Sequence, residues 1–278
     1  MSTPALHRLA RVRPGSRVVV RHLIEGGERA TDVLGELVKL GEVEVVVERR
    51  GERIAIPVAD VVIAKEVPPA PDRWRVAAFL RRAGVAVLDL DGVIRTFDES
   101  GAVAAMETRL GFRQGGFMGL AFGLPEASAM VVGKARYAEW AAAVRARLIS
   151  DGHPEEAAEA AIATWTSDHG SPIAPTVELV DGLLAAGTPT FVFTNGTDRV
   201  PTELERIGLG HLLPHLLNAA DLGFAKPAPE SYAVAHAEIE RRLGRRVGVG
   251  EVHFTDDRPS NVDAAREFGW QARVFTLP

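Results

Sequence analysis

The sequence predicts two unequal parts: a small antiparallel β domain and a larger α/β domain with a doubly wound parallel sheet. Apolar residues mostly alternate with period two before a proline-rich segment at 67–72, and short apolar strands alternate with helical segments after it. The length of 278 residues agrees with about two domains. We therefore place the first domain at residues 1–66, a linker at 67–74 and the second domain at 75–278.

The first domain is expected to be a small all-β barrel-like domain, with an open hairpin sheet as the alternative. Residues 42–48 and 53–56 largely alternate between polar and apolar side chains, and residues 17–21 and 60–64 are short β-branched runs. Four or five short strands at regular spacing are typical of such barrels. Gly35, inside the second strand, favours a bulge or a barrel corner.

The second domain is expected to have a Rossmann-like core. Five short apolar segments predict its strands, at 85–90, 190–194, 216–219, 252–255 and 273–275. Helical segments separate them, at 176–186, 198–207, 229–243 and 259–268. Strands that alternate with helices in this way predict a parallel, doubly wound sheet.

One interval interrupts this alternation. Residues 98–174 contain no convincing strand, whereas Tyr137, Trp140, Val144 and Leu148 recur at helical spacing. An alanine-rich helical run follows them. The interval therefore predicts a helical insertion between the first and second strands of the core.

The composition excludes several kinds of functional site and a membrane-spanning protein. The chain has no cysteine, which excludes disulfides, thiolate zinc sites, iron–sulfur clusters and cysteine nucleophiles. No apolar run approaches the roughly 18 residues needed to cross a bilayer. The N-terminus is basic but lacks the apolar core of a signal peptide. We therefore expect a cytoplasmic protein that does not bind membranes.

The charge is unevenly distributed. The net charge of −5 argues against a general attraction to nucleic acid. The first 80 residues nevertheless carry 13 Lys and Arg against 11 Asp and Glu. Five of these basic residues lie within the first 21 positions: Arg8, Arg11, Arg13, Arg17 and Arg21. Residues 1–66 thus allow a nucleic-acid contact, although a solvated arm is the preferred interpretation.

Polar residues cluster where the predicted strands of the core end. They are Asp89, Asp91, Thr194, Asn195, Lys226, Asp256 and Asp257. Because parallel strands end at a common edge of the sheet, where ligands bind, we expect these residues to lie close together. Crowded carboxylates raise each other's pKa, and a divalent cation beside them offsets this rise. A site that offers only oxygen ligands favours Mg²⁺ over zinc. The lysine, the hydroxyl group and nearby backbone amides suit an anionic group, and phosphate fits.

Four segments together resemble, in order, the motifs of the haloacid dehalogenase-like hydrolase superfamily. They are 85–94 (VAVLDLDGVI), 191–196 (FVFTNG), 223–232 (GFAKPAPESY) and 252–262 (VHFTDDRPSNV). The resemblance spans about residues 83–278, and the helical insertion resembles the α-helical cap of that family. The branch that looks most similar contains bacterial phosphatases and the phosphatase domain of soluble epoxide hydrolases.

The resemblance implies a role for each matched residue. Asp89 is the implied nucleophile, which forms an aspartyl-phosphate, and Asp91 is the implied general acid and then general base. The Asp89 side chain and the Asp91 backbone carbonyl are implied Mg²⁺ ligands, with Asp257 as a direct ligand and Asp256 holding a metal-bound water. Three residues are implied to bind the phosphoryl oxygens: Thr194, Asn195 and Lys226. Asn261 is implied to order the loop that contains Asp256 and Asp257.

Asp91 distinguishes the reactions of this superfamily. A halide leaves without a proton, and dehalogenases typically lack this aspartate. The resemblance therefore implies a Mg²⁺-dependent phosphatase acting on a small phosphorylated metabolite. One alternative is a sugar-phosphate mutase, which shares these residues. The other is a regulatory or binding protein whose N-terminal barrel recognises nucleic acid or a partner, and the intact motif set favours the enzyme over it.

Arg95 departs from the small or apolar residue that is common after the first motif. We assign it to the binding of an anionic substrate, with a contact to the cap or a surface salt bridge as alternatives. Candidate cap residues for substrate choice are Arg109, Arg113, Gln114 and Lys134. The sequence specifies neither the substrate nor the oligomeric state.

Overall fold

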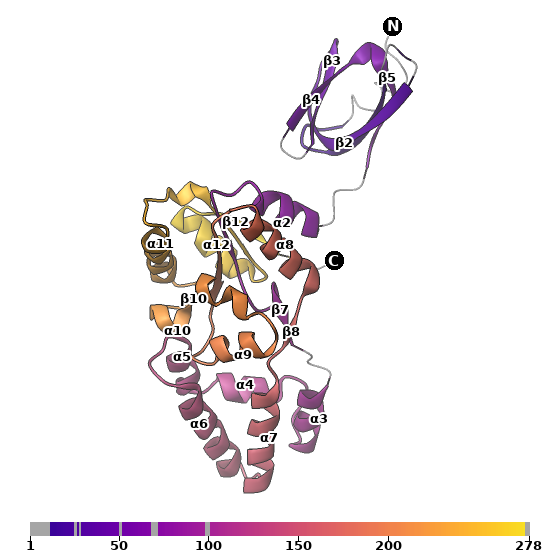
Figure 1. The fold of residues 1–278 in the computed structure, drawn as a ribbon. Helices are drawn as coiled ribbons and strands as arrows, with labels where there is room; N and C mark the ends of the chain where they lie inside the picture. The colour runs from indigo at the N-terminus through magenta and orange to yellow at the C-terminus, as the bar shows by residue number, and fades with distance from the viewer. Residues whose placement is uncertain are drawn as a thin grey trace. The chain divides into compact units, whose positions relative to one another are not determined.

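The computed structural model describes residues 12–24, 27, 29–49, 52–67, 72–97 and 101–275. The chain divides into two compact units, Met1–Ala78 and Phe79–Pro278 (Figure 1). Arg8 and Arg11 of the basic N-terminus and the prolines at 68, 69 and 71 lie outside the described residues. Helix α2 (Asp72–Leu80) begins inside the segment that the sequence predicted as a linker.

The first unit is a five-stranded antiparallel sheet in the order β4-β3-β2-β1-β5, which confirms the predicted all-β domain. Its elements are β1 (Arg17–Ile24), β2 (Arg29–Leu40), β3 (Glu44–Arg49), β4 (Glu52–Pro57), a 3₁₀ turn η2 (Val58–Asp60) and β5 (Val61–Glu66). Val18 and Val20 of β1 are fully buried, as alternation predicts. At Gly35 the backbone of β3 passes so close that a Cβ atom would lie 2.2 Å from the Glu48 carbonyl oxygen. Of the two alternatives predicted there, the bulge is wrong, because the register shifts between Leu37 and Lys39 instead, and the barrel corner stays a prediction.

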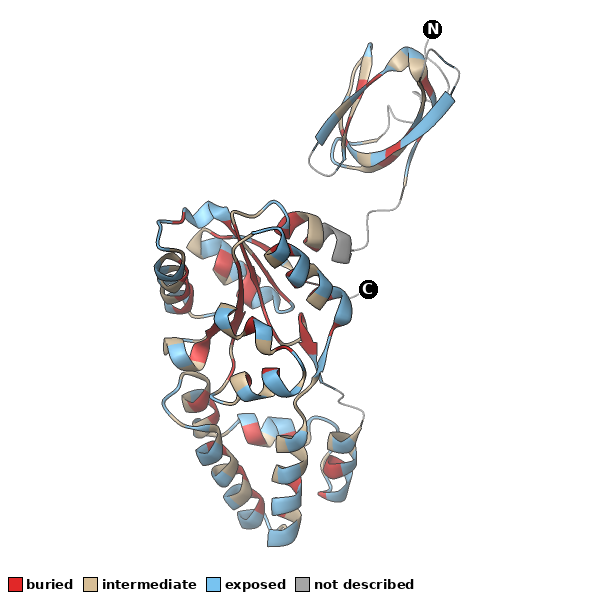
Figure 2. Ribbon diagram, viewed as in Figure 1, coloured by how far each residue is buried: buried red, intermediate tan, exposed pale blue. Residues whose placement is uncertain are grey.

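The second unit contains a five-stranded sheet in the order β10-β9-β6-β11-β12, and every pair of neighbouring strands is parallel. Its strands are β6 (Val85–Leu88), β9 (Thr190–Thr194), β10 (Leu216–Asn218), β11 (Val252–Asp256) and β12 (Gln271–Val274). All residues of β6 and β9 are buried, because helices cover both faces of the sheet (Figure 2). The predicted doubly wound core is confirmed.

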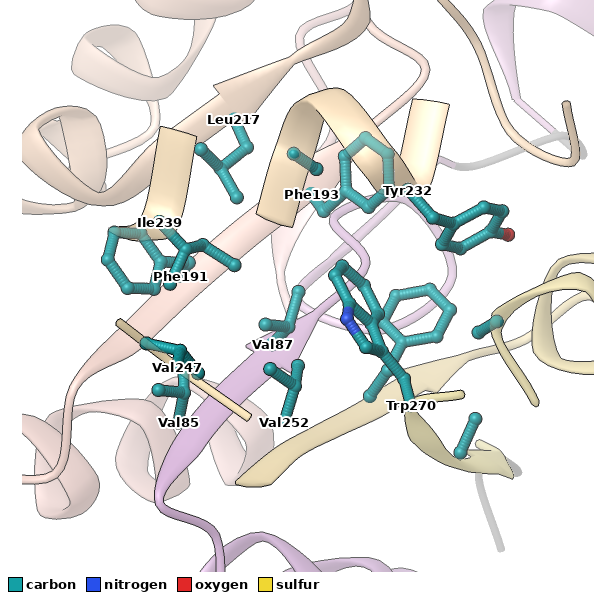
Figure 3. Close-up of a cluster of buried hydrophobic side chains, with 14 of the residues drawn as sticks. Val85, Val87, Phe191, Phe193, Leu217, Tyr232, Ile239, Val247, Val252 and Trp270 are labelled. Carbon is teal, nitrogen blue, oxygen red and sulfur yellow. The ribbon is translucent and has the colours of Figure 1, made fainter. Parts of the chain in front are cut away.

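The helices of the core follow the predicted alternation. They are α8 (Ala174–Ala185), α9 (Val200–Arg206), α10 (Ala219–Leu222), α11 (Pro229–Leu243) and α12 (Pro259–Phe268), with 3₁₀ turns η3 (Gly210–His215) and η4 (Val249–Glu251). Tyr232 of α11 and Trp270 pack against Phe193 of β9 in one buried cluster (Figure 3). This cluster holds β9 and β11 in place beneath the loops that follow them.

The strand order fixes where those loops meet. From β6 the chain proceeds to β9 and β10 on one side, and β11 and β12 lie on the other side. The carboxyl end of β6 is therefore the point at which the winding reverses, and crevices for ligands form there in open α/β sheets.

The insertion after β6 is helical, and its helices gather beside the core sheet (Figure 1). They are α3 (Ala102–Arg109), α4 (Gly116–Phe122), α5 (Pro125–Val131), α6 (Tyr137–Ser150) and α7 (Glu155–Ser167). Trp140, Val144 and Leu148 are fully buried in a separate core of the insertion, as their spacing predicts.

The expectation that residues 98–174 hold no strand is wrong at their end. Strand β8 (Ser171–Pro172) pairs antiparallel with β7 (Arg95–Thr96), and this short ladder closes the base of the insertion. Two residues per strand leave no periodic pattern to detect, so the pairing depends on tertiary contacts. Among the described residues, no helix is both long enough and apolar enough to span a bilayer.

Candidate active site

The predicted polar residues lie at the carboxyl ends of the core strands. Asp89 follows β6 directly, Thr194 ends β9, and Asp256 ends β11. Lys226 comes from the loop between α10 and α11. The structure brings one oxygen atom each of Asp89, Asp256 and Asp257 within 4.8 Å of one another. Residues far apart in sequence thus form one acidic cluster at the point where the winding reverses.

Lys226 is buried in the middle of this cluster. Its Nζ donates to Asp256 Oδ2 at 2.6 Å and to the Phe193 carbonyl oxygen at 2.7 Å, and it lies 2.9 Å from Asp89 Oδ1. An ammonium group has three N–H bonds, and these three oxygens match them in number. The lysine therefore compensates two buried carboxylates and fixes their separation.

Asp256 is fully buried and is held by the protein itself. The Nδ2 group of Asn261 lies 3.0 Å from both of its carboxylate oxygens, and the Arg258 backbone N–H donates to Oδ1 at 2.9 Å. Together with Lys226, these donors leave Asp256 well suited to orienting its neighbours. Asn261 is thereby placed to order the loop after β11.

Asn195 connects two loops of the site. Its Nδ2 group donates to the Lys226 carbonyl oxygen at 2.7 Å, and its Oδ1 accepts from the Lys226 backbone N–H at 2.8 Å. Its side-chain amide therefore fixes the lysine loop against the end of β9. The contact of Asn195 with phosphate stays a prediction.

The electrostatics of the cluster favour a cation. Burial raises the pKa of Asp89 to about 7, Lys226 opposes this rise and Asp256 adds to it. Burial, and then Asp256, also raise the pKa of Asp257. A positive ion beside these carboxylates stabilises their charged forms. The cluster offers only oxygen ligands, which Mg²⁺ prefers.

Gly92 lies directly beside Asp257 of the cluster. It adopts a φ of +81°, and a Cβ atom there would lie 2.3 Å from Asp257 Oδ2. The missing side chain therefore lets the Asp257 carboxylate approach the backbone that follows Asp91. That close approach agrees with a metal held jointly by the Asp257 side chain and the Asp91 carbonyl group.

We expect Gly92→Ala to weaken Mg²⁺ binding about tenfold or more, because the new methyl group displaces Asp257. Calorimetric titration with Mg²⁺ measures this effect directly. Gly187→Ala is the matched control: Gly187 has a φ of +75°, but nothing lies within 4 Å of its Cβ position. Both variants incur backbone strain, so equal Mg²⁺ affinity for the two would contradict the assignment of Asp257.

Asp91 and Arg95 form a pair beside the cluster. Arg95 Nε donates to Asp91 Oδ1 at 2.7 Å, and a terminal nitrogen of Arg95 donates to Oδ2 at 3.2 Å. The other terminal nitrogen donates to Glu203 Oε2 at 2.9 Å. The Arg95 side chain is only 2% exposed, so the alternative of a surface salt bridge is wrong. Direct binding of a substrate by Arg95 stays a prediction.

Glu203 is a site residue that the sequence reasoning missed. It lies on α9 among other charged residues, and no spacing distinguishes it from them. The usable signal was Arg95 itself, because a buried guanidinium requires more than one acceptor.

The four candidate cap residues are exposed: Arg109, Arg113, Gln114 and Lys134. Lys134 lines an open pocket of about 490 Å³ that includes Phe122 and Val131 of the insertion and Phe224 and Ala225 of the lysine loop. The structure thus places Lys134 near the loop of Lys226, whereas the selection of substrates by any of the four stays a prediction.

A family model described as haloacid dehalogenase-like hydrolase matches residues 83–269. The chain belongs to the haloacid dehalogenase-like hydrolase family. The resemblance predicted from the four motifs is thereby confirmed, and the helical insertion is in the position of the cap. Residues 12–65 match a second model, described as the Rv0428c N-terminal Sm-like domain, which agrees with the small β domain.

Individual relatives of this haloacid dehalogenase-like hydrolase are more distant. An uncharacterized hydrolase of Schizosaccharomyces pombe is 33% identical over 87 residues, which are 31% of this chain and 38% of that protein's length. An aspartate-to-alanine variant of a family enzyme from Bacteroides thetaiotaomicron, solved with magnesium and inorganic phosphate, is 16% identical with a TM-score of 0.51. The match covers 68% of this chain and 92% of that one.

A dehalogenase solved with an intermediate complex is similar to the same degree. It is 20% identical with a TM-score of 0.51, over 69% of this chain and 84% of that one. At such identities the two structures establish the shared fold. The choice between phosphate and halide chemistry must therefore come from the residues of this chain.

Proposed function

We propose that this hydrolase is a Mg²⁺-dependent phosphatase that hydrolyses a small phosphorylated metabolite. The observation that carries the proposal is Asp91, a second carboxylate two residues after Asp89 in the same loop. An alkoxide is a poor leaving group, so its oxygen must be protonated as its bond to phosphorus breaks, whereas a halide leaves without a proton. A carboxyl group in this position therefore favours phosphate esters over haloacids.

The residues divide the reaction between them. Asp89 attacks phosphorus and forms an aspartyl-phosphate, while Asp91 gives a proton to the oxygen of the departing alcohol. Asp91 then takes a proton from the water that attacks the intermediate, so inorganic phosphate is released and Asp89 is regenerated. Lys226, Thr194 and the backbone amides around Asn195 bind the phosphoryl oxygens.

Mg²⁺ fits the cluster as an oxygen-bound ion. The Asp89 side chain, the Asp91 carbonyl group and Asp257 would hold it, and Asp256 would orient a water beside it. When bound, the ion neutralises charge on the phosphoryl oxygens and keeps Asp89 ionised. Asp256 is suited to an indirect role because Lys226, Asn261 and the Arg258 backbone N–H already donate to it.

The full chain should release inorganic phosphate from 4-nitrophenyl phosphate only when Mg²⁺ is present. EDTA should abolish the release and added Mg²⁺ should restore it, because the crowded acids need a cation to face an anionic substrate. A parallel assay with 2-chloropropionate should release no chloride. Full phosphate release in metal-free buffer, or chloride release without phosphate release, would show that the proposal is wrong. A panel of phosphorylated metabolites then identifies the substrate.

A further inference from the structure

Arg95 is a buried cation that the proposed chemistry does not yet use. Its side chain is 2% exposed and binds two carboxylates, Asp91 and Glu203, as well as the His169 carbonyl oxygen at 3.4 Å. Burying a guanidinium costs free energy unless its donors are satisfied. These partners satisfy it, and one of them is the proposed general acid.

The contact with Arg95 fixes the orientation of the Asp91 carboxylate as well as its distance from the guanidinium group. Two nitrogens of one planar guanidinium bind the two oxygens of one carboxylate, at 2.7 and 3.2 Å. Such two-point pairs fix the plane of the carboxylate, which a single contact cannot do. Asp91 is itself 44% exposed, so few other groups restrict its side chain.

The opposite side of Arg95 is anchored toward the cap. Glu203 Oε1 lies 3.5 Å from Nε of Arg199, and Arg199 donates to the Thr166 carbonyl oxygen of α7 at 2.7 Å. The Arg199 guanidinium also lies over the Tyr137 ring of α6, 4.3 Å from its centre. A continuous set of charged contacts therefore runs from Asp91 to the two longest helices of the cap.

We propose that Arg95, anchored by Glu203, is a positioning residue that orients the Asp91 carboxyl group toward the leaving oxygen. The inference rests on the proposed phosphatase function, in which Asp91 protonates that oxygen. It replaces direct substrate binding as the role of Arg95. A misoriented Asp91 slows the expulsion of poor leaving groups and leaves the expulsion of good ones nearly unaffected, whereas its later role as the base toward water is common to all substrates.

The test compares glycerol 3-phosphate, whose alkoxide needs a proton, with 4-nitrophenyl phosphate, whose phenolate does not. Arg95→Met should lower kcat/KM, which reports the steps up to the departure of the alcohol, by about tenfold to a hundredfold for the alkyl ester, at most the roughly hundredfold lower end of what a general acid supplies, because Asp91 itself is retained. It should change kcat/KM for the aryl ester less than threefold, because the departure of a phenolate needs no proton. Glu203→Met should show the same bias, because Arg95 then loses its anchor.

Arg95→Lys covers the possibility that Arg95→Met fails to fold, which circular dichroism reveals. Lysine retains the buried charge but cannot reach both Asp91 oxygens and Glu203 at once, so the bias against the alkyl ester should persist. The matched control is Arg147→Met, which removes another arginine paired with an aspartate four residues away, on an exposed face of α6. The control should keep the wild-type ratio of alkyl to aryl kcat/KM.

The outcomes separate the two proposals. Equal losses of kcat/KM for both esters, or a wild-type ratio of the two kcat/KM values in Arg95→Lys, would overturn the positioning role. Asp91→Asn is the reference variant for the phosphatase proposal. If Asp91→Asn shows no bias against the alkyl ester, the assignment of the general acid fails. If it shows the bias and the Arg95 variants do not, only the present inference fails.

Discussion

Asp89→Asn should reduce turnover of every substrate by about four orders of magnitude or more, as expected when the nucleophile of a covalent mechanism is removed. An amide cannot attack phosphorus, whatever the leaving group, so aryl and alkyl phosphates should be affected alike. This distinguishes Asp89 from Asp91. Phosphate release and acid-quenched trapping of a phosphorylated protein measure the loss, and neither signal should survive.

The variant should remain folded. Asparagine retains an Oδ1 acceptor for the Leu90 backbone N–H, which binds Asp89 Oδ1 at 2.7 Å, and it removes a buried charge. The control is Asp263→Asn, since Asp263 forms an exposed pair with Arg266 and lies outside the acidic cluster. Residual turnover above about one per cent of wild type would contradict covalent catalysis by Asp89.

Lys226→Met should lower the free energy of unfolding by about 3–5 kcal/mol, because it leaves two buried carboxylates without their cation. The Asp89 and Asp256 side chains have exposed fractions of 9% and 0%. The loss of Lys226 should also raise the pKa of Asp89, since the lysine opposes the effect of burial. Phosphate release should fall about a hundredfold or more, because the phosphoryl oxygens lose a buried donor.

Urea unfolding measures the first effect, and Mg²⁺ provides an internal check. An ion that binds the folded cluster stabilises it by mass action, so Mg²⁺ should restore part of the stability of Lys226→Met. Lys39→Met is the control, because Lys39 is 64% exposed in a surface pair with Glu44. Its unfolding free energy should change by less than about 0.5 kcal/mol. Equal stability of Lys226→Met and wild type would contradict the central role of the lysine.

Much of the fold could be predicted because its strands are fully buried. The residues of β6 and β9 are apolar runs with both faces covered, which gives the strongest strand signal in a chain of this kind. The β7–β8 ladder could not be predicted. Two residues on each side carry no period, and Pro172 reads as a loop residue.

The site residues that lie at the ends of strands could be predicted from the sequence. Asp89, Thr194 and Asp256 follow from the rule that parallel strands end at one edge. The partners of Lys226 could not be derived, because its loop is irregular and the Phe193 carbonyl oxygen is a backbone group. Glu203 was missed for a similar reason: its importance arises from a buried arginine that lies 108 residues earlier in the chain.

The ladder between β7 and β8 has an evolutionary consequence. Because Arg95 pairs with Pro172 and Thr96 with Ser171, the chain leaves the core and returns to it at adjacent points. Paired residues in such a ladder are about 5 Å apart, a gap that a short turn spans. Whatever folds between them can be lengthened, trimmed or exchanged while β6 and β9 stay in place. Recombination, or a protein engineer, can therefore graft a different cap onto the same core, provided that the new cap preserves the contact of Arg95 with the backbone of His169 and offers partners to Arg199 in place of Thr166 and Tyr137.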